Sequence, residues 1–444
     1  MKLFGTDGIR GKAGVAPLDP PTVARVGAAL VRSLGDTGKP VRVLIGRDTR
    51  ESGDWIEQEL TRGLTGEGAT AVSIGVIPTP AVAYLTSSQG FDAGIVISAS
   101  HNPYEDNGIK IFSCRGEKLD EKLEAGIERL IADTSWQVSG DNTVPTADTG
   151  LAQHYVTHLR KILPEAGALS CARVVIDCGN GATVTVAPTL FKALGFEVTV
   201  IGDRPNGRNI NLECGSTHLA LLQKTVVARE ARFGVAFDGD GDRALFVDRH
   251  GNTIDGDAIL LIAGDQLKEE GQLPGAALVA TVMSNIGLEL ALRERGIEMV
   301  RAPVGDKYVM EEMVKRGLVL GGEQSGHIIF ASHLFTGDGI GTALHMLRIM
   351  AATGKELDEL AGALVTYPQV LVNVRVRERA DYMTIPAIAE SIRGVEQRLE
   401  GNGRLLIRYS GTEPLLRIMI EGKDDGEIRQ WANEIADLVK DQLG

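Results

Sequence analysis

The sequence lacks a surplus of positive charge. Its 444 residues carry 46 Lys and Arg against 59 Asp and Glu, which gives a formal net charge of −13. Because a nucleic-acid backbone is bound through a basic face, this balance argues against a nucleic-acid partner. An anionic substrate would need Arg and Lys side chains gathered locally to overcome the overall negative field.

Long apolar runs and paired cysteines are also missing. No segment approaches the roughly 20 apolar residues of a membrane-spanning helix, and the start, MKLFGTDGIRG, has no apolar core of a secretion signal. No C-x-x-C pair occurs among the four cysteines, Cys114, Cys171, Cys178 and Cys214. So few thiols in so long a chain are typical of reduced cytosolic residues. We therefore expect a cytoplasmic protein without a membrane partner.

Two nucleotide-binding motifs are absent as well. Every Gly-Lys pair is followed by Ala, Pro, Glu or Asp, so the sequence contains no G-x-x-x-x-G-K-[ST] phosphate loop. The stretch GNGATV follows an apolar run, as a dinucleotide-binding loop would, but it lacks the last glycine. We therefore predict neither a phosphate-loop nucleotide site nor an NAD site.

One structural unit is present three times, and a chain of this length is too long for one hydrophobic core. The unit is an apolar strand, a Gly-rich turn, a helix and a second strand after glycine, and it covers 41–75, 172–202 and 276–305. Such alternation predicts mixed or parallel sheets covered by helices on both faces. After Tyr367, short strands alternate with two long polar helices, which is typical of a smaller α+β domain. We expect three similar α/β domains and a fourth α+β domain, with bounds 1–150, 151–252, 253–366 and 367–444.

The strongest local signal is FGVAFDGDGDRALFVD, in which Asp238, Asp240 and Asp242 lie between two apolar strands. Alternate residues of an extended loop point the same way, and three facing carboxylates repel one another unless a cation binds. Oxygen ligands select Mg²⁺ or Ca²⁺, and Arg243 and Arg249 stand where an EF-hand needs Gly and Glu. A solvated acidic turn is the alternative. Mg²⁺ prefers few carboxylates plus a phosphate oxygen, so this loop predicts a phosphate partner.

A second signal is SASHNP, which follows the apolar run 93–97. There is no G-x-S-x-G elbow, and His101 points away from its neighbour Ser100 on an extended chain, so serine-hydrolase chemistry fits poorly. Ser100 could instead carry a phosphoryl group whose oxygen completes the Mg²⁺ shell; a helix N-cap is the alternative. Lys110 could be an acid, a charge partner or a solvated lysine. Asp242, at the fifth position of D-x-D-x-[TV], weakens a phosphatase interpretation.

Two further loops carry polar side chains. GGEQSGHIIF presents Glu323, Ser325 and His327 on one face, which suits a pair of sugar hydroxyls or an ordinary turn, and Lys307 lies in PVGDKY. In the last domain, IRYSGTEPLLRIM predicts a phosphate-gripping loop, with a hairpin bearing surface arginines as the alternative. Its contributing residues are Arg408, Ser410, Gly411, Thr412 and Arg417.

Five motifs in this order, GTDGIRG, SASHNP, DGDGDR, GEQSGH and RYSGTEP, resemble the α-D-phosphohexomutase family. The resemblance implies a four-domain enzyme around a central cleft, an isomerase that moves a phosphoryl group between two positions of a hexose. It implies phosphoserine at Ser100 and one Mg²⁺ ion held there and by the three aspartates of DGDGDR. Lys110 and His327 would then exchange protons, while Arg10 and Arg243 would lie near the phosphoserine.

For the substrate, the resemblance implies sugar contacts from Glu323 and Ser325 and distal-phosphate binding by the Arg408 loop. Lys307 stands where the family leads us to expect Arg, which keeps the charge but loses the bidentate fork. At Gln324 and in 205–218 the sequence is similar to family members that act on glucosamine phosphates.

The activity so implied interconverts glucosamine 6-phosphate and glucosamine 1-phosphate, with glucosamine 1,6-bisphosphate as intermediate and activator, and feeds UDP-N-acetylglucosamine synthesis. Glucose or mannose phosphates as substrates, a Mg²⁺-dependent sugar phosphatase and a non-catalytic sugar-phosphate sensor are the alternatives. A homodimer is one assembly compatible with the sequence, which leaves the oligomeric state open.

Overall fold

The computed structural model describes residues 2–5, 7–35, 38–140, 145–410 and 414–444. The chain divides into two compact units. Unit 1 comprises Met1–Met283 and Met299–Ala361, and unit 2 comprises Ser284–Glu298 and Gly362–Gly444. None of the helices in the described part of the chain combines the length and the apolar character that crossing a bilayer requires.

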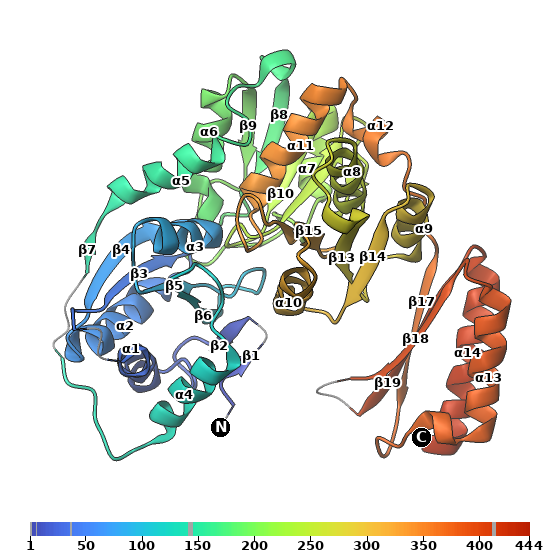
Figure 1. Cartoon of the computed structure of the whole chain (residues 1–444), viewed down its shortest axis with the longest axis horizontal. Coiled ribbons are helices and arrows are strands. Elements are labelled where there is room, and N and C mark those ends of the chain that lie inside the picture. The colour runs from blue at the N-terminus through green and yellow to red at the C-terminus, as the bar shows by residue number, and fades with distance from the viewer. Residues whose placement is uncertain (1, 6, 36–37, 141–144, 411–413) are drawn as a thin grey trace. The chain divides into compact units, whose positions relative to one another are not determined.

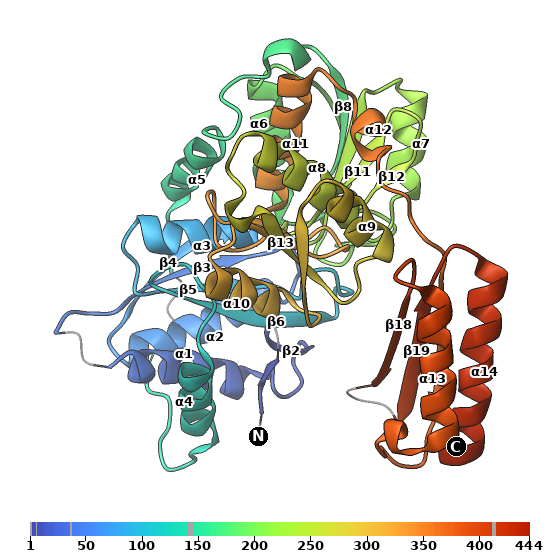
Figure 2. The same cartoon turned by 45° about the vertical axis from the view of Figure 1, so that its right-hand side comes forward.

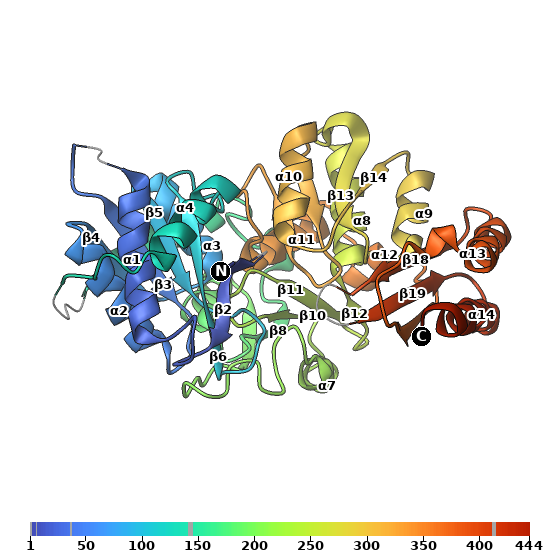
Figure 3. The same ribbon diagram turned by 90° about the horizontal axis from the view of Figure 1, so that it is seen from below.

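The first sheet of unit 1 has seven strands in the order β1-β2-β6-β5-β3-β4-β7. Its strands β3, β4, β5 and β7 run parallel to one another. Next to them, β6 pairs antiparallel with β5, and β2 pairs antiparallel with β6; β2 and β6 lie side by side in Figure 3. The strand bounds are Phe4–Gly5, Gly8–Lys12, Arg42–Arg47, Thr70–Val76, Ala93–Ile97, Asp106–Ser113 and Thr146–Ala147 for β1 to β7.

Helices cover both faces of this sheet, as Figure 1 shows. On one face lie α1 (Pro20–Leu34), α2 (Gly53–Gly66) and α4 (Glu121–Ala132), whose apolar side chains share one core with β3 and β5. On the other face lies α3 (Thr79–Ser88), close to β3 and β5. Every residue of β5 is buried, because each of its two faces packs against helices.

Unit 1 contains two more sheets, in the orders β12-β11-β10-β8-β9 and β14-β13-β15-β16. In each, parallel strands lie next to an antiparallel strand. The strand bounds are Arg173–Asp177 (β8), Glu197–Ile201 (β9), Phe233–Phe237 (β10), Ala244–Asp248 (β11), Thr253–Ile254 (β12), Ala277–Thr281 (β13), Glu298–Ala302 (β14), Leu320–Gly322 (β15) and Ile328–Phe330 (β16). The helices are α5 (Ala152–Leu159), α6 (Ala187–Ala193), α7 (Ala220–Ala228), α8 (Gly256–Glu269), α10 (Asp306–Arg316), α11 (Gly339–Thr353) and α12 (Leu357–Ala361).

Unit 2 is built on an antiparallel sheet in the order β17-β19-β18, with bounds Gln369–Arg375 (β17), Arg404–Tyr409 (β18) and Leu415–Glu421 (β19). The helices α13 (Pro386–Leu399) and α14 (Asp425–Leu443) lie side by side on one face of it (Figure 2). Their apolar stripes form the core with alternate strand residues such as Ile418 and Ile420. The helix α9 (Ile286–Glu294) also belongs to unit 2, since Asn285 donates to the Tyr367 carbonyl at 3.0 Å and Ile286 N–H to Glu421 Oε2 at 3.2 Å.

The predicted fold class is confirmed: three mixed sheets with helices precede a smaller sheet-and-helix domain. The three repeated units correspond to β3 and β4, β8 and β9, and β13 and β14 with the helices between them. The four domain bounds, and a central cleft between all four domains, stay predictions.

Candidate active site

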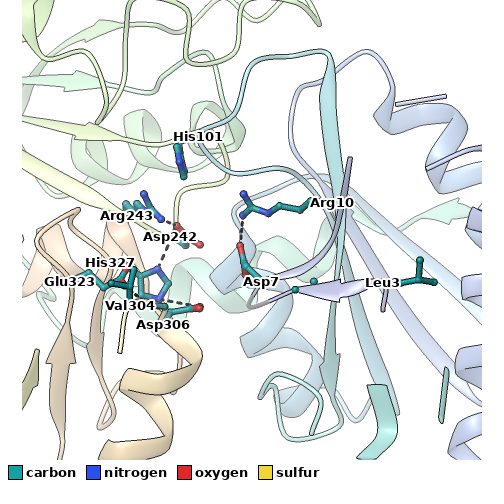
Figure 4. Close-up of a pocket in the computed structure, with 13 residues that line it drawn as sticks. Leu3, Asp7, Arg10, His101, Asp242, Arg243, Val304, Asp306, Glu323 and His327 are labelled. Atoms are coloured by element: carbon teal, nitrogen blue, oxygen red, sulfur yellow. Dashed lines mark hydrogen bonds and ion pairs between the residues drawn. The ribbon is translucent and has the colours of Figure 1, made fainter. Parts of the chain in front are cut away.

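A cavity of about 390 Å³ lies in unit 1 where loops of all three sheets meet (Figure 4). One loop follows β5, one joins β10 to β11 and one joins β15 to β16. Loops at the ends of sheet strands are the usual place for a binding site in α/β folds. The residues that line the cavity are Leu3, Gly5, Asp7, Gly8, Arg10, His101, Asp242, Arg243, Val304, Gly305, Asp306, Glu323 and His327.

Ser100 lies three residues after the end of β5. It is buried beside the loop that carries Asp238, Asp240 and Asp242. Its Oγ donates to Asp238 Oδ2 at 2.6 Å and lies 3.3 Å from His101 Nδ1. Its φ of 52° is in the left-handed region, which is strained for a residue other than glycine and asparagine. The structure therefore holds the Ser100 hydroxyl against Asp238, one of the three aspartates predicted to bind the metal.

The three aspartates form one buried cluster in which a ligand oxygen from each lies within 4.8 Å of the others. Burial, and then the carboxylates of Asp242 and Asp240, raise the pKa of Asp238 well above its usual value. Within the described residues, Oδ1 of Asp240 and Oδ1 of Asp242 are buried and accept no hydrogen bond. A hard divalent cation fits such a donor set, because it would satisfy these oxygens and relieve the repulsion.

The glycines between the aspartates are required by close packing. A Cβ atom on Gly239 would lie 2.5 Å from the Ser100 carbonyl oxygen. Gly241 has a φ of 72°, and a Cβ atom there would lie 2.6 Å from Cγ2 of Thr183. Gly239 therefore lets the serine loop approach the carboxylates directly, and Gly241 gives the aspartate loop its left-handed turn beside Thr183.

Lys110, on β6, is the buried counter-charge of this cluster. Its Nζ lies 2.8 Å from Asp240 Oδ2, 3.0 Å from Asp7 Oδ2 and 3.3 Å from Asp242 Oδ2. Burial alone would lower the pKa of Lys110, but these three carboxylates outweigh it and raise the pKa well above its usual value. Burial would likewise raise the pKa of Asp242, but Lys110 and His327 hold that pKa well below its usual range.

His327 is buried between two carboxylates. Its Nδ1 lies 3.6 Å from Asp242 Oδ1 and its Nε2 3.7 Å from Asp306 Oδ2 (Figure 4). Burial, and the N–H of Gly337 at 3.1 Å from Nε2, favour the neutral ring. The carboxylates prevail and raise the pKa of His327 to about 9.

The remaining predicted residues of unit 1 divide into two groups. Glu323 lines the cavity, accepting the Gly305 N–H at 3.0 Å and the Ser325 hydroxyl at 3.4 Å. Arg10 and Arg243 also line it. Lys307 lies elsewhere, with Nζ 3.5 Å from Glu121 Oε1 and 3.7 Å from Glu124 Oε2 on α4.

In unit 2, Arg408 on β18 is the register partner of Arg417 on β19. Arg417 Nη2 lies 3.5 Å from the Ser410 hydroxyl, and Arg379 donates to the Ser410 carbonyl at 2.7 Å. The two arginines therefore flank the predicted phosphate-gripping loop, whose Gly411 and Thr412 lie outside the described residues.

Three charged residues of the cavity region were not predicted. Lys118 Nζ bridges Asp7 Oδ1 at 2.6 Å and Asp306 Oδ2 at 2.5 Å. Asp7 and Asp306 each stand in a motif that was singled out, GTDGIRG and PVGDKY, so the signal was there. Lys118 belongs to no motif, and only the fold brings it to Asp7 and Asp306 at the cavity.

Family models of all four domains match this chain: phosphoglucomutase/phosphomannomutase alpha/beta/alpha domains I, II and III and the C-terminal domain. The matched residues are 1–138, 153–251, 255–367 and 371–438 respectively. The chain belongs to the phosphoglucomutase/phosphomannomutase family.

Within that family, it is similar over its full length to curated proteins named phosphoglucosamine mutase. One from Solibacter usitatus is 50% identical over 443 residues, covering 100% of this chain and 99% of the relative. Another, from Geobacter sp. strain M21, is 48% identical over 451 residues and covers 100% and 98%.

Solved structures agree on the fold. A phosphoglucomutase/phosphomannomutase family protein from Burkholderia thailandensis has a TM-score of 0.81 at 25% identity, covering 100% of this chain and 98% of that one. An N-acetylphosphoglucosamine mutase from Aspergillus fumigatus, in complex with GlcNAc-6P and magnesium, has a TM-score of 0.67 at 19% identity. It covers 100% of this chain and 96% of its own.

Proposed function

We propose that this protein is an isomerase that interconverts glucosamine 6-phosphate and glucosamine 1-phosphate through a phosphorylated Ser100. The observation that carries the proposal is the 2.6 Å contact between the Ser100 hydroxyl and Asp238, inside a buried three-aspartate cluster beside a charged cavity. The full-length similarity to proteins named phosphoglucosamine mutase supports the reaction class and the sugar.

Mg²⁺ held by Asp238, Asp240, Asp242 and a phosphoryl oxygen on Ser100 would neutralise the charge that spreads over the transferring group. In the first half-reaction, a sugar hydroxyl oxygen bonds to phosphorus while the bond from phosphorus to Ser100 Oγ breaks. The hydroxyl proton leaves and Oγ gains a proton. We assign this proton exchange to Lys110 and His327, which are the two protonatable groups beside Asp242.

The second half-reaction needs the bisphosphorylated sugar to turn over and return its other phosphate to Ser100. Glu323 and Ser325 suit two sugar hydroxyls in either orientation, and Arg10 and Arg243 supply positive charge beside the reacting phosphate. The Arg408 and Arg417 pair would hold the phosphate that does not react. Water must be excluded throughout, because a phosphoserine exposed to water would hydrolyse.

The sugar preference has chemical support in the cavity lining. Glucosamine carries an ammonium group at C2 where glucose and mannose carry a hydroxyl. Asp7, Asp242, Asp306 and Glu323 line the cavity. Arg10, Arg243 and His327 line the same cavity, so these carboxylates favour a cation only modestly, and hydroxyl contacts alone would not separate the three sugars. The preference for glucosamine therefore rests mainly on the similarity to proteins named phosphoglucosamine mutase.

Side-by-side kcat/KM values for the 1-phosphates of glucosamine, glucose and mannose test the proposal. We expect the highest value for glucosamine 1-phosphate; a higher value for either other sugar would reassign the substrate and leave the chemistry standing. Release of inorganic phosphate in stoichiometric amounts would favour a phosphatase instead. Persistence of turnover in excess chelator would remove the metal from the scheme.

Two separate measurements address the remaining expectations. Intact-protein mass should show a phosphorylated species, and its absence after incubation with a hexose 1,6-bisphosphate would favour a non-catalytic sensor. Light scattering tests the homodimer.

A further inference from the structure

We infer that Arg50 and Asp48 form a buried clamp that positions the loop carrying Ser100, so that Arg50 is a positioning residue of the reaction. The clamp is defined as the Asp48–Arg50 pair together with Ser98. The inference rests on the proposed role of Ser100 as the phosphoryl carrier, and it names residues outside the cavity lining.

The guanidinium of Arg50 uses all five of its N–H donors. Nε donates to Asp48 Oδ2 at 2.9 Å, and the side chain is fully buried. Nη1 and Nη2 donate to four backbone carbonyls of the segment 100–106, those of Ser100, Asn102, Pro103 and Asp106. The contacts to Ser100, Asn102 and Asp106 measure 2.9 to 3.0 Å. One planar cation thus fixes the direction of four peptide groups, which only the fork of an arginine can do.

Asp48 extends the clamp to the amide side of Ser100. Its Oδ2 also accepts the Ser98 hydroxyl at 2.6 Å, and Ser98 Oγ in turn accepts the Ser100 N–H at 2.9 Å. Ser100 is therefore held at its amide through Ser98 and at its carbonyl by Arg50. A second donor, Asn211 Nδ2, also reaches the Ser100 carbonyl at 3.0 Å.

This double hold explains how Ser100 keeps its strained backbone. A φ of 52° persists at a serine only where surrounding contacts determine it. The contacts that do so here are the two hydrogen bonds to the Ser100 peptide groups from the clamp. Loss of the clamp should let the loop relax and carry Oγ away from Asp238.

The same contacts exclude a direct role in binding phosphate. All five donors of Arg50 are occupied, and Asp48 balances its charge. Arg10 and Arg243, in contrast, line the cavity. A clamp defect should therefore lower kcat and leave KM nearly unchanged, because the affinity for substrate does not depend on it.

Arg50→Lys is the primary test, because lysine keeps the charge beside Asp48 but cannot span four carbonyls. We expect kcat to fall at least tenfold with KM within twofold of wild type. We also expect a shifted or broadened ³¹P resonance of phospho-Ser100. Arg47→Lys is the matched control: Arg47 lies three residues earlier and pairs with Glu57 at 3.1 Å and Asp54 at 2.5 Å, and it should retain wild-type values.

Ser98→Ala is the second variant, and it decides the matter if Arg50→Lys does not fold. It removes one buried hydroxyl, and with it the link from Asp48 to the Ser100 amide. We expect a several-fold loss of kcat with an unchanged KM and an altered ³¹P signal. Folded variants with wild-type kcat and ³¹P signal would overturn the clamp, and so would a tenfold rise in KM at constant kcat.

The phosphorylation readout separates this inference from the proposed function. If wild-type protein incubated with glucose 1,6-bisphosphate gains no phosphate on Ser100, the proposed function fails and the clamp's role in it fails too. If wild type is phosphorylated and both variants match it in rate, ³¹P signal and kcat, the clamp alone is wrong.

Discussion

Replacing Lys110 with methionine tests whether the aspartate cluster is a divalent-cation site. Lys110 is buried and lies within 3.3 Å of carboxylates of Asp240, Asp7 and Asp242. Removing one partner of a buried ion pair costs about 3–5 kcal/mol, because the opposite charge is left uncompensated. Methionine retains the unbranched length of lysine and so limits the loss of packing. In chelator, we expect Lys110→Met to be less stable than wild type by about that amount.

Mg²⁺ should then recover more stability in the variant than in wild type. A cation that binds only the folded state stabilises it by about 2.7 kcal/mol at a hundred times its Kd. Lys110 shares its carboxylates with the proposed ion, so its removal should strengthen Mg²⁺ binding. Urea unfolding at a series of Mg²⁺ concentrations measures both effects.

Lys118→Met is the matched control for this experiment. Lys118 is also buried between two carboxylates, but its partners are Asp7 and Asp306. It should lose comparable stability in chelator without gaining an enhanced response to Mg²⁺. Equal Mg²⁺ responses in the two variants, or a Lys110→Met protein as stable as wild type in chelator, would refute the assignment of the cluster.

Three other changes have defined outcomes. Ser100→Ala should abolish turnover while leaving the fold intact; more than a few per cent residual activity would place the phosphoryl carrier elsewhere. Arg408→Ala should raise KM roughly tenfold or more, since a charge-assisted hydrogen bond contributes about 1.5–3 kcal/mol, and an unchanged KM would make the loop structural. The pKa of His345 is lowered to about 3, mainly by burial and then by His333 and Arg348. The folded state therefore keeps this ring neutral, and it loses stability as the pH falls below about 6.5, where the ring of the unfolded chain takes up a proton. His345→Phe should preserve the stack on Phe330 and reduce that acid loss in melting curves at pH 7 and 5; an unchanged loss would contradict it.

Much of the fold could be predicted because its central strands are buried on both faces. The apolar run 93–97 is β5 from Ala93 to Ile97, with each of its residues buried. The pair β1–β2 at the edge of the sheet was not predicted. These strands have only two and five residues, are rich in glycine and carry no apolar pattern. The repeated unit 276–305 predicted a helix between its two strands, but that pattern does not say with which sheet the helix packs, and α9 belongs to the unit of the C-terminal sheet.

The candidate site divides in the same way. The aspartate cluster and Ser100 could be proposed because chemistry and spacing coincide within one short segment. Arg50 could not, because its segment GRDTRESGD is polar and looks like an exposed loop. Its burial depends on four carbonyls that lie about fifty residues further along the chain. Lys118 was missed for a similar reason, since its two partners come from distant segments.

The charges around the cavity are consistent with the proposed divalent cation and with arginines held close to the reacting phosphate. A connected set of ion pairs runs from Lys110 through Asp7, Lys118, Asp306 and His327 to Asp242 and back to Lys110. Six carboxylates stand in and beside the cavity, and five basic side chains oppose them: Lys110, Lys118, Arg10, Arg243 and His327. A phosphoryl group on Ser100 would add a further charge of about −1.5 to −2 at neutral pH. These cations are already opposed by the carboxylates, so a divalent ion at the aspartate cluster would supply the positive charge that the proposed phosphorylated Ser100 would need in a buried site.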